Sequence, residues 1–455
     1  MGSGVASPIL PLHRPTRRAT VSWCLFDFAN SSFTTLIATV AFAVYFRDVV
    51  VHAADNRGDQ LWGIANFLAM LAVALSSPIM GALADYSGRK KLFLILTTLV
   101  TVIATALLYF VGPGDIILAM LLYILGLTGF ELGYVFYNAF LPQVSTPQTV
   151  GRVSGWGWGV GYIGGLLCLL ACSPWIRHPR TDSLGAIDPA GVAAYQTSFL
   201  LVAAFYIVFA LPAFLWLHES APQGRIQRWT AYAGIGFRRV RETLSHLRQY
   251  RETAKYILAS LCFTDGITTI IAFAGIYATT TMGFSEQELI LLFLVLNIVA
   301  FPGSLAAGYL ADAIGPKRTI VLTLILWIAV VLAGCAATSK SMFWLMAVGA
   351  ALGIGSTQSV GRSFMAQITP PSRESEFFGF YVLSGKFGSM FGPLVFGLMS
   401  RATGSQRAAV LSLLPFFLLG LAFMLRIDED RARRATAEDR PLPAGSPQCD
   451  ILDLS

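Results

Sequence analysis

A series of twelve apolar runs constrains the fold of this chain more than any other feature of its sequence. Each run is long enough to cross the ~30 Å hydrocarbon core of a bilayer. Backbone N–H and C=O groups in lipid must be satisfied within the protein, so we expect helices rather than isolated strands. The runs lie at about 21–47, 61–84, 92–111, 115–140, 151–172 and 197–217, and then at 255–282, 287–311, 319–337, 341–366, 376–400 and 407–427.

The composition agrees with a membrane location. Of the 455 residues, 55% are hydrophobic and only 13% are charged. The mean hydropathy is +0.65, which a soluble domain could hardly carry without large exposed apolar patches. Six cysteines are scattered along the chain, and no His or carboxylate joins Cys168 and Cys172 at metal-ligand spacing. We therefore predict an all-α membrane protein with twelve transmembrane helices, without a disulfide framework or a metal site.

A short charged segment occurs twice, each time between the second and third apolar runs of a group of six. It reads Gly-Ala-Leu-Ala-Asp-Tyr-Ser-Gly-Arg-Lys-Lys at 81–91 and Gly-Tyr-Leu-Ala-Asp-Ala-Ile-Gly-Pro-Lys-Arg at 308–318. Glycines let helix ends approach closely, and an aspartate with nearby cations can make contacts that form in one conformation and break in another. For either copy alone, an ordinary cation-rich cytoplasmic loop is the alternative. We predict a gating hinge composed of Gly81, Asp85, Gly88, Arg89, Lys90, Asp312, Lys317 and Arg318.

The arrangement of the runs as six plus six predicts five segments along the chain. They are a cytoplasmic N-tail at 1–20, an N-terminal six-helix bundle at 21–217, a cytoplasmic amphipathic linker at 218–254, a C-terminal six-helix bundle at 255–427 and a disordered cytoplasmic tail at 428–455. With both termini in the cytoplasm, 24 of the 32 Lys and Arg residues lie on the cytoplasmic side and seven on the other, in agreement with the positive-inside rule. We expect no cleavable signal peptide, and a monomer in the plasma (inner) membrane.

Polar side chains within the runs of the first half are the candidates for a transport pathway. A charge in the middle of a span costs about 2.5–3.5 kcal/mol on translocon scales, so it needs a cavity, a partner or a function. Asp27, Asn30 and Thr34 share one helical face, which must look into the bundle. Glu131, near mid-membrane, and Asn138 lie two turns apart on the fourth run. A carboxylate at that depth suits a proton carrier, so we predict proton-coupled movement of a small polar solute with Glu131 as the carrier.

The second half carries matching polar groups. Asp265 in the seventh run mirrors the aspartate of the first run, Gln358 and Arg362 share a face of the tenth, and Lys386 lies near the middle of the eleventh. A cation in each half could receive a substrate carboxylate. Equally, Lys386 could neutralise Glu131 or Asp265.

Structural ion pairs are the alternative for the acids of the first half. Asp27 could pair with Arg18 near the inner surface, and Glu131 could be held permanently by Arg152 or Lys386. In that case, replacing Glu131 would reduce stability rather than proton coupling.

Absent motifs argue against other classes of function. The five histidines lie in tails or loops, and the sequence has no His-x3-His, no Gly-x-Ser-x-Gly and no Gly-x4-Gly-Lys-Ser/Thr. We expect no enzyme activity, no ATP-driven pumping, no cofactor and no nucleic-acid partner. The expected partners are a small-molecule substrate, a proton or other coupling ion, and the lipid bilayer. A non-transporting receptor or a lipid scramblase on the same scaffold remains the competing class.

The duplicated hinge resembles the loop motif of the major facilitator superfamily, with Pro316 in the second copy where an arginine is usual. The residues around Trp23 and Asp27, together with 137–142, 152–165 and 362–379, are similar to the unknown major facilitator branch, which is related to vacuolar amino-acid effluxers. The resemblance runs from the first apolar run to the eleventh. It implies two pseudo-symmetric six-helix bundles of the major facilitator fold, secondary active transport by alternating access, and export of neutral amino acids.

Overall fold

A computed structural model describes residues 15–52, 57–176, 188–219, 238, 241, 250–371, 373–387 and 391–438. Within these residues the regular structure is helical, and twelve helical spans are long and apolar enough to cross a membrane. The predicted fold class is therefore confirmed. The elements of the N-terminal bundle are α1 (Arg17–Ser32) with its continuations η1 (Phe33–Val40), α2 (Ala41–Tyr45) and η2 (Phe46–Val51), then α3 (Arg57–Ser87), α4 (Lys90–Leu107) with η3 (Leu108–Phe110), α5 (Ile116–Ala139), α6 (Leu141–Val144), α7 (Val150–Cys172) and α8 (Pro189–Trp216).

The C-terminal bundle has the same order of spans. The eleventh is described on either side of residues 388–390, which lie outside the described residues, and the twelfth consists of two helices. Its elements are α10 (Arg251–Thr280), α11 (Glu286–Ile314), α12 (Pro316–Ala336), α13 (Lys340–Ile368), α14 (Glu374–Phe387) followed by α15 (Phe391–Thr403), α16 (Gln406–Leu411) followed by α17 (Leu414–Leu425), and the short α18 (Glu429–Glu438).

Local sequence signals fix several helix starts. The Asp188 side chain accepts hydrogen bonds from the backbone N–H groups of Ala190 and Gly191, and proline occupies the first position of α8. Ser285 and Glu288 form a capping box at the start of α11. These caps satisfy N–H groups that a helix leaves without partners at its first turn.

The burial pattern is the one expected in lipid. Large apolar side chains lie on the outside, for example Ile117, Leu345 and Leu75, which are 76%, 75% and 67% exposed. Charged side chains within the spans face inward, and Asp27 and Arg362 are buried.

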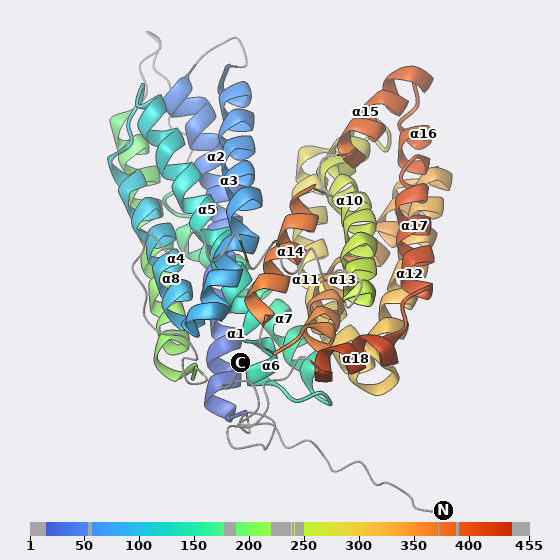
Figure 1. The fold of residues 1–455 in the computed structure, drawn as a ribbon. Coiled ribbons are helices and arrows are strands. Elements are labelled where there is room, and N and C mark those ends of the chain that lie inside the picture. Colours follow the sequence, from blue (N-terminus) through green and yellow to red (C-terminus); the bar gives the residue numbers. More distant parts are fainter. Residues whose placement is uncertain are drawn as a thin grey trace, which may run out of the picture.

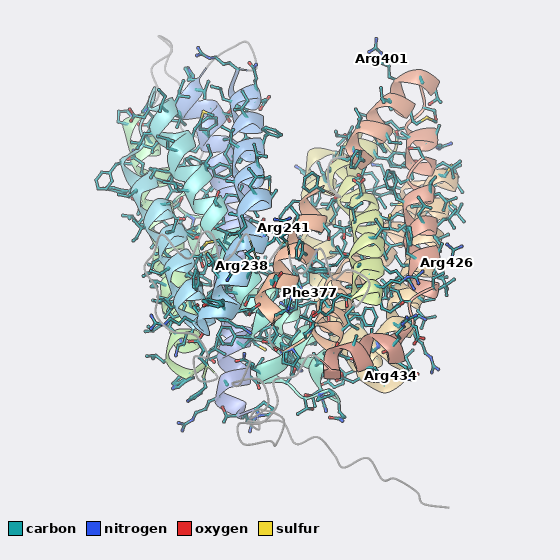
Figure 2. The ribbon with its side chains drawn as sticks, viewed as in Figure 1. Arg238, Arg241, Phe377, Arg401, Arg426 and Arg434 are labelled. Atoms are coloured by element: carbon teal, nitrogen blue, oxygen red, sulfur yellow. The ribbon has the colours of Figure 1, made fainter. Side chains whose placement is uncertain are left out.

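The two six-helix groups lie side by side and approach each other at one end (Figure 1). We call this the terminal end, because α1 begins there and α18 lies there. Contacts between the groups join α3 to α14 and α7 to α11 and α13. Figure 2 shows Arg434 of α18 toward the terminal end and Arg401 at the opposite end.

The structure differs from the predicted segment boundaries at two places. Residues 429–438, expected to be part of a disordered tail, form α18, which packs against α10 and α13. The helix is anchored because Ala432 is buried and Arg433 donates a hydrogen bond to the Gln367 side chain at 3.0 Å. The seventh span begins at Arg251, four residues before the predicted start. The N-tail before residue 15, the rest of the tail and the linker apart from residues 218, 219, 238, 241 and 250–254 lie outside the described residues.

Candidate transport site and gate between the bundles

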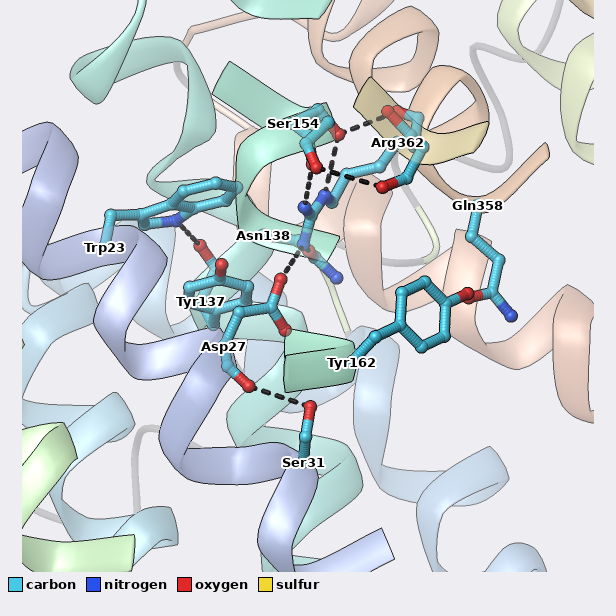
Figure 3. Close-up of polar contacts among 12 residues, drawn as sticks. Trp23, Asp27, Ser31, Tyr137, Asn138, Ser154, Tyr162, Gln358 and Arg362 are labelled. Carbon is cyan, nitrogen blue, oxygen red and sulfur yellow. Dashed lines mark hydrogen bonds and ion pairs between the residues drawn. The ribbon is translucent and has the colours of Figure 1, made fainter. Parts of the chain in front are cut away.

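Arg362 of α13 reaches from the C-terminal bundle into the N-terminal bundle (Figure 3). Its guanidinium donates to the Asp27 carboxylate at 3.0 Å, to the Ser154 hydroxyl at 3.0 Å and to the Ser154 carbonyl at 2.8 Å. A longer contact of 3.4 Å joins it to the Asn138 side-chain oxygen. Arg362 is only 1% exposed and Asp27 2%. The arrangement uses the fork of guanidinium donors, which a single ammonium group could not reproduce.

Aromatic rings surround this guanidinium. Its central carbon lies 4.6 Å from the Trp23 ring centroid and 5.5 Å from those of Tyr137 and Trp158. Trp23 and Tyr137 stack at 4.5 Å, and the Trp23 indole N–H donates to the Tyr137 carbonyl at 2.9 Å. Space for the guanidinium depends on Gly157, where a Cβ would lie 2.7 Å from an Arg362 nitrogen. The result is a positive group between aromatic faces, a favourable cation–π geometry.

The other predicted pathway residues near this cluster are placed as follows. Asn30 is buried on α1, one turn beyond Asp27. Gln358 lies one turn before Arg362 on α13 and accepts a hydrogen bond from the Tyr162 hydroxyl at 3.2 Å. Thr34 lies in η1, the π-helical continuation of α1. Its hydroxyl donates to the Ser31 carbonyl of the preceding turn and not to a residue of the cluster. The structure thus brings Asp27, Asn138 and Arg362 together, with Gln358 beside them.

A second ion pair crosses between the bundles, from α14 to α5. Lys386 of α14 donates to the Glu131 carboxylate of α5 at 2.5 Å. The side chains are 28% and 10% exposed. Of the partners considered from the sequence for Glu131, the structure selects Lys386. Asp27 pairs with Arg362, which the sequence did not suggest, and not with Arg18.

Asp265 has a different environment. It is 1% exposed, and one carboxylate oxygen accepts the backbone N–H of Gly392 in α15 at 2.7 Å. The other oxygen is buried and, in the part of the chain that the structure describes, has no hydrogen-bond partner. The Thr269 hydroxyl donates to the backbone carbonyl of Asp265, not to its carboxylate. Lys386 therefore neutralises Glu131 rather than Asp265 in this conformation.

The first hinge joins α3 to the start of α14. The Asp85 carboxylate accepts the backbone N–H groups of Ser375 and Glu376 at 3.1 and 2.8 Å. Lys90 lies 3.3 Å from Asp85 and also pairs with Glu374. A negative charge at a helix N-terminus is favourable because it meets unsatisfied N–H groups and the positive end of the helix dipole.

Two glycines of this hinge are required by geometry. A Cβ at Gly81 would overlap the Ser375 carbonyl, so only glycine lets α3 approach α14 this closely. Gly88 has φ 62°, the left-handed region, where the chain turns from α3 into α4. Arg89 follows it and precedes the first residue of α4.

The second hinge repeats the arrangement with the bundles exchanged. Asp312 of α11 accepts the backbone N–H groups of Gly151 and Arg152, at 2.7 and 3.0 Å, at the start of α7. The Arg152 side chain lies 3.5 Å from the same carboxylate. Gly308 approaches α7 so closely that its Cβ would lie 2.5 Å from the Gly151 carbonyl. Each hinge aspartate thus caps a helix of the opposite bundle.

The lysines that follow the hinges hold helix ends within their own bundle. Lys91 donates to the Leu217 carbonyl at 2.8 Å, just beyond α8, and Lys317 donates to the Ile427 carbonyl at 2.7 Å, just beyond α17. Glu219, which follows α8, accepts the backbone N–H of Lys91 at 2.8 Å, and its burial raises its pKa. Arg318 lies in the first turn of α12. Lys90 therefore stabilises the contact between the bundles, whereas Lys91 and Lys317 each bind a helix end of their own bundle.

A model of the family described as "Vacuole effluxer Atg22 like" matches residues 64–437. The chain belongs to this family. An "Uncharacterized MFS-type transporter YxiO" from Bacillus subtilis (strain 168) is 29% identical over 93% of this chain and 97% of its own. "Autophagy-related protein 22" from Coccidioides immitis (strain RS) is 25% identical over 79% of this chain and 70% of its own.

Solved structures show the same fold for this Atg22-like chain. The fucose transporter FucP in the outward conformation superposes with a TM-score of 0.72, at 14% identity, over 90% of this chain and all of its own. The proton:xylose symporter XylE gives a TM-score of 0.70 at 12% identity, over 90% and 94% of the two chains. These structures share the fold. Together with the family match and the MFS-type relative, this shows that the chain is a multi-pass membrane transporter of the major facilitator superfamily and not an enzyme.

Some residues of the site in this Atg22-like protein escaped sequence reasoning. Ser154 supplies two acceptors to Arg362, but a serine among glycines gives no signal beyond small size. Trp23 and Tyr137 belong to the segments that resemble the family, but nothing in the sequence indicates that they surround a guanidinium. Glu374 lies at the start of α14, where a carboxylate favours the helix N-terminus, and this position could have indicated a partner for the hinge cations.

Proposed function

We propose that this protein is a secondary active transporter of a small zwitterionic solute, with neutral amino acids as the substrate class, and that it works by alternating access. The observation that carries the proposal is the buried Asp27–Arg362 pair, which places a carboxylate and a guanidinium 3.0 Å apart at the junction of the two bundles. The family description, an effluxer, supports export as the direction.

The chemistry of this pair matches both charges of an α-amino acid. A guanidinium binds a carboxylate through two parallel hydrogen bonds, and a carboxylate binds an ammonium group. When the bundles separate and Arg362 moves away from them, the rings of Trp23 and Trp158 offer apolar faces to a neutral side chain. If the bundles separate at the terminal end, the ion pair between Asp27 and Arg362 breaks. Each side chain then becomes a buried charge without a partner, which costs free energy. A zwitterion offsets that cost by pairing with each of them.

We further propose that a proton drives transport and that Glu131 carries it. Glu131 and Lys386 belong to opposite bundles, so separation of the bundles parts them. Within hydrocarbon a carboxylate without its cation needs another positive partner, and a proton is the smallest that can reach it. The terminal end would then face the cytoplasm of a plasma membrane, as the distribution of cations predicts.

Flux into proteoliposomes tests the proposal and separates a transporter from a receptor or scramblase. Accumulation of radiolabelled neutral amino acids is measured with and without a pH gradient, and a lipid-flip assay runs in parallel. We expect Glu131→Gln to remain folded, to lose gradient-driven accumulation and to keep substrate counterflow. Glu288→Gln is the matched control, because Glu288 forms an exposed ion pair with Lys340 at 2.7 Å within one bundle.

Two outcomes would contradict the proposal. Normal gradient-driven accumulation by a well-folded Glu131→Gln protein would eliminate Glu131 as the carrier. Lipid flipping without flux of any amino acid would favour the scramblase instead.

A further inference from the structure

Asp265 is a buried carboxylate inside the C-terminal bundle. It lies in the middle of α10, where one carboxylate oxygen accepts the Gly392 backbone N–H at 2.7 Å and the other has no hydrogen-bond partner among the residues that the structure describes. The helices touch closely here, since a Cβ at Gly392 would overlap the Thr269 hydroxyl and lie 2.8 Å from the Asp265 carboxylate. This contact connects the seventh span directly to the eleventh.

The charged groups on the elements around Asp265 are engaged elsewhere or lie at the ends of the helices. Arg362 of α13 pairs with Asp27, and Lys386 of α14 pairs with Glu131. On α10 itself, Lys255 pairs with Glu252 and lies ten residues from Asp265, or about 15 Å along the helix. α15 carries Arg401 in its last turn, and α17 has no charged residue. The acids of α11 lie at its two ends, α13 begins with Lys340, and α14 has Glu374 and Glu376 in its first turn. α18 lies at the terminal end, where Arg433 pairs with Glu429. The titratable neighbour on the same helix is the Cys262 thiol.

Asp265 therefore differs from the other two acids of the pathway. Asp27 and Glu131 each have a cation from the opposite bundle, whereas within the described residues no cation forms an ion pair with Asp265. An isolated carboxylate deep in a bilayer is expensive, and such residues mark ion or proton pathways. A partner for the Asp265 carboxylate must be positive, and it must be small enough to bind without displacing a packed side chain.

We propose that Asp265 is a second proton-binding site, located wholly in the C-terminal bundle, and that its occupancy controls how firmly the eleventh span is held to the seventh. An ionised carboxylate forms a charge-assisted bond to the Gly392 N–H, which is roughly twice as strong as the bond that a neutral acid accepts. The residue after Gly392 is Pro393, which has no N–H to donate, so Pro393 cannot replace the Gly392 bond to Asp265. Proton binding to Asp265 loosens α15 from α10, and proton release tightens the contact.

This site is independent of the proposed carrier, because it requires neither substrate nor the Glu131–Lys386 pair. Infrared titration of the full-length protein in lipid nanodiscs measures it directly, through the carbonyl stretch of a protonated carboxyl group. We expect a component of this band to grow as the pH falls, to be absent from Asp265→Asn and to persist in Glu131→Gln. Glu288→Gln is again the control and keeps the component. Titration of Asp265→Asn identical to wild type would overturn the proposal.

A second measurement does not depend on the folding of Asp265→Asn. Spin labels at Ile271→Cys on α10 and Leu398→Cys on α15, both exposed side chains at 43% and 59%, report the separation of the two helices in a background without native cysteines. We expect the distance distribution to broaden toward longer values as the pH falls, with the same midpoint as the infrared component. A distribution unchanged across that pH range would also overturn the proposal. Failure of amino-acid flux, by contrast, would affect only the proposed function.

Discussion

Arg362 combines two roles that a single side chain rarely serves. It closes the contact between the bundles through Asp27 and Ser154, and it is the proposed receptor for a substrate carboxylate. Both roles depend on the planar fork of donors and on stacking against Trp23. A lysine at this position keeps the positive charge but loses the planar fork of donors. The contribution of the charge can therefore be separated experimentally from that of the directed hydrogen bonds.

Arg362→Lys should weaken the binding of a neutral α-amino acid by roughly 5- to 150-fold, equivalent to about 1–3 kcal/mol, because one ammonium group replaces several directed bonds. Equilibrium binding of radiolabelled leucine, competed by leucine or by its decarboxylated amine, measures the effect. Wild type should prefer the amino acid to the amine, and Arg362→Lys should lose much of that preference.

The matched control is Arg433→Lys on α18. Arg433 is 52% exposed on its side chain and pairs with Glu429 one turn away, so its replacement should leave binding unchanged. An Arg362→Lys protein with wild-type affinity and wild-type discrimination would contradict carboxylate recognition by Arg362.

At the scale of helices, the two hinges act as reciprocal caps. Asp85 of the N-terminal bundle caps α14, and Asp312 of the C-terminal bundle caps α7. Each aspartate accepts two backbone N–H groups across the interface, and Lys90 supports the first hinge through Asp85 and Glu374. Because a cap acts only when the helix end is within reach, each aspartate favours the conformation in which the terminal end is closed.

Asp85→Asn and Asp312→Asn should each favour opening of the terminal end. The asparagine oxygen can still accept a hydrogen bond, but the negative charge at the helix N-terminus is lost. Loss of that charge costs about 0.3–2 kcal/mol, which shifts the balance of conformations roughly two- to thirty-fold. We expect Asp85→Asn to slow flux while equilibrium substrate binding stays within a few fold. Flux and binding are measured on the same preparation.

Asp188→Asn supplies the control, because Asp188 caps α8 by the same chemistry but within one bundle. It should change stability slightly and leave the conformational balance alone. A loss of binding in Asp85→Asn as large as the loss of flux would reject the separation of gating from binding.

The sequence predicts these elements better than it predicts their partners. Run length and polarity identify the twelve spans, and helical spacing places Asp27 and Asn30 on one face. That spacing does not say which face meets another helix far away in the chain. Arg18 was an allowed partner for Asp27, and Arg362 replaces it only because α13 packs against α7. The helix α18 was missed because its ten residues are polar, and its docking depends on Gln367 of another element.

At the scale of the whole molecule, the contacts that join the bundles concentrate toward the terminal end. The Asp27–Arg362 pair, the Glu131–Lys386 pair and the two caps all cross between bundles. Opening this end requires them to break together, since each bundle packs as a rigid group of helices. Binding of substrate and protons then has a direct mechanical consequence, because both replace partners that the closed interface provides.

A covalent bridge across the terminal end should therefore stop transport. In a background without native cysteines, Lys90→Cys and Glu374→Cys replace an ion pair that joins α4 to the start of α14. A short bifunctional thiol reagent should link the two positions, and flux in proteoliposomes should fall to background, because the interface can no longer open. Cleavage of a reducible linker should restore flux.

Lys255→Cys with Glu252→Cys is the control pair, since it replaces an ion pair of 2.8 Å within α10 alone, and its linkage should leave flux unchanged. Undiminished flux in protein that gel analysis shows to be fully linked at positions 90 and 374 would mean that the bundles do not separate at this end, and alternating access through the terminal end would then be wrong.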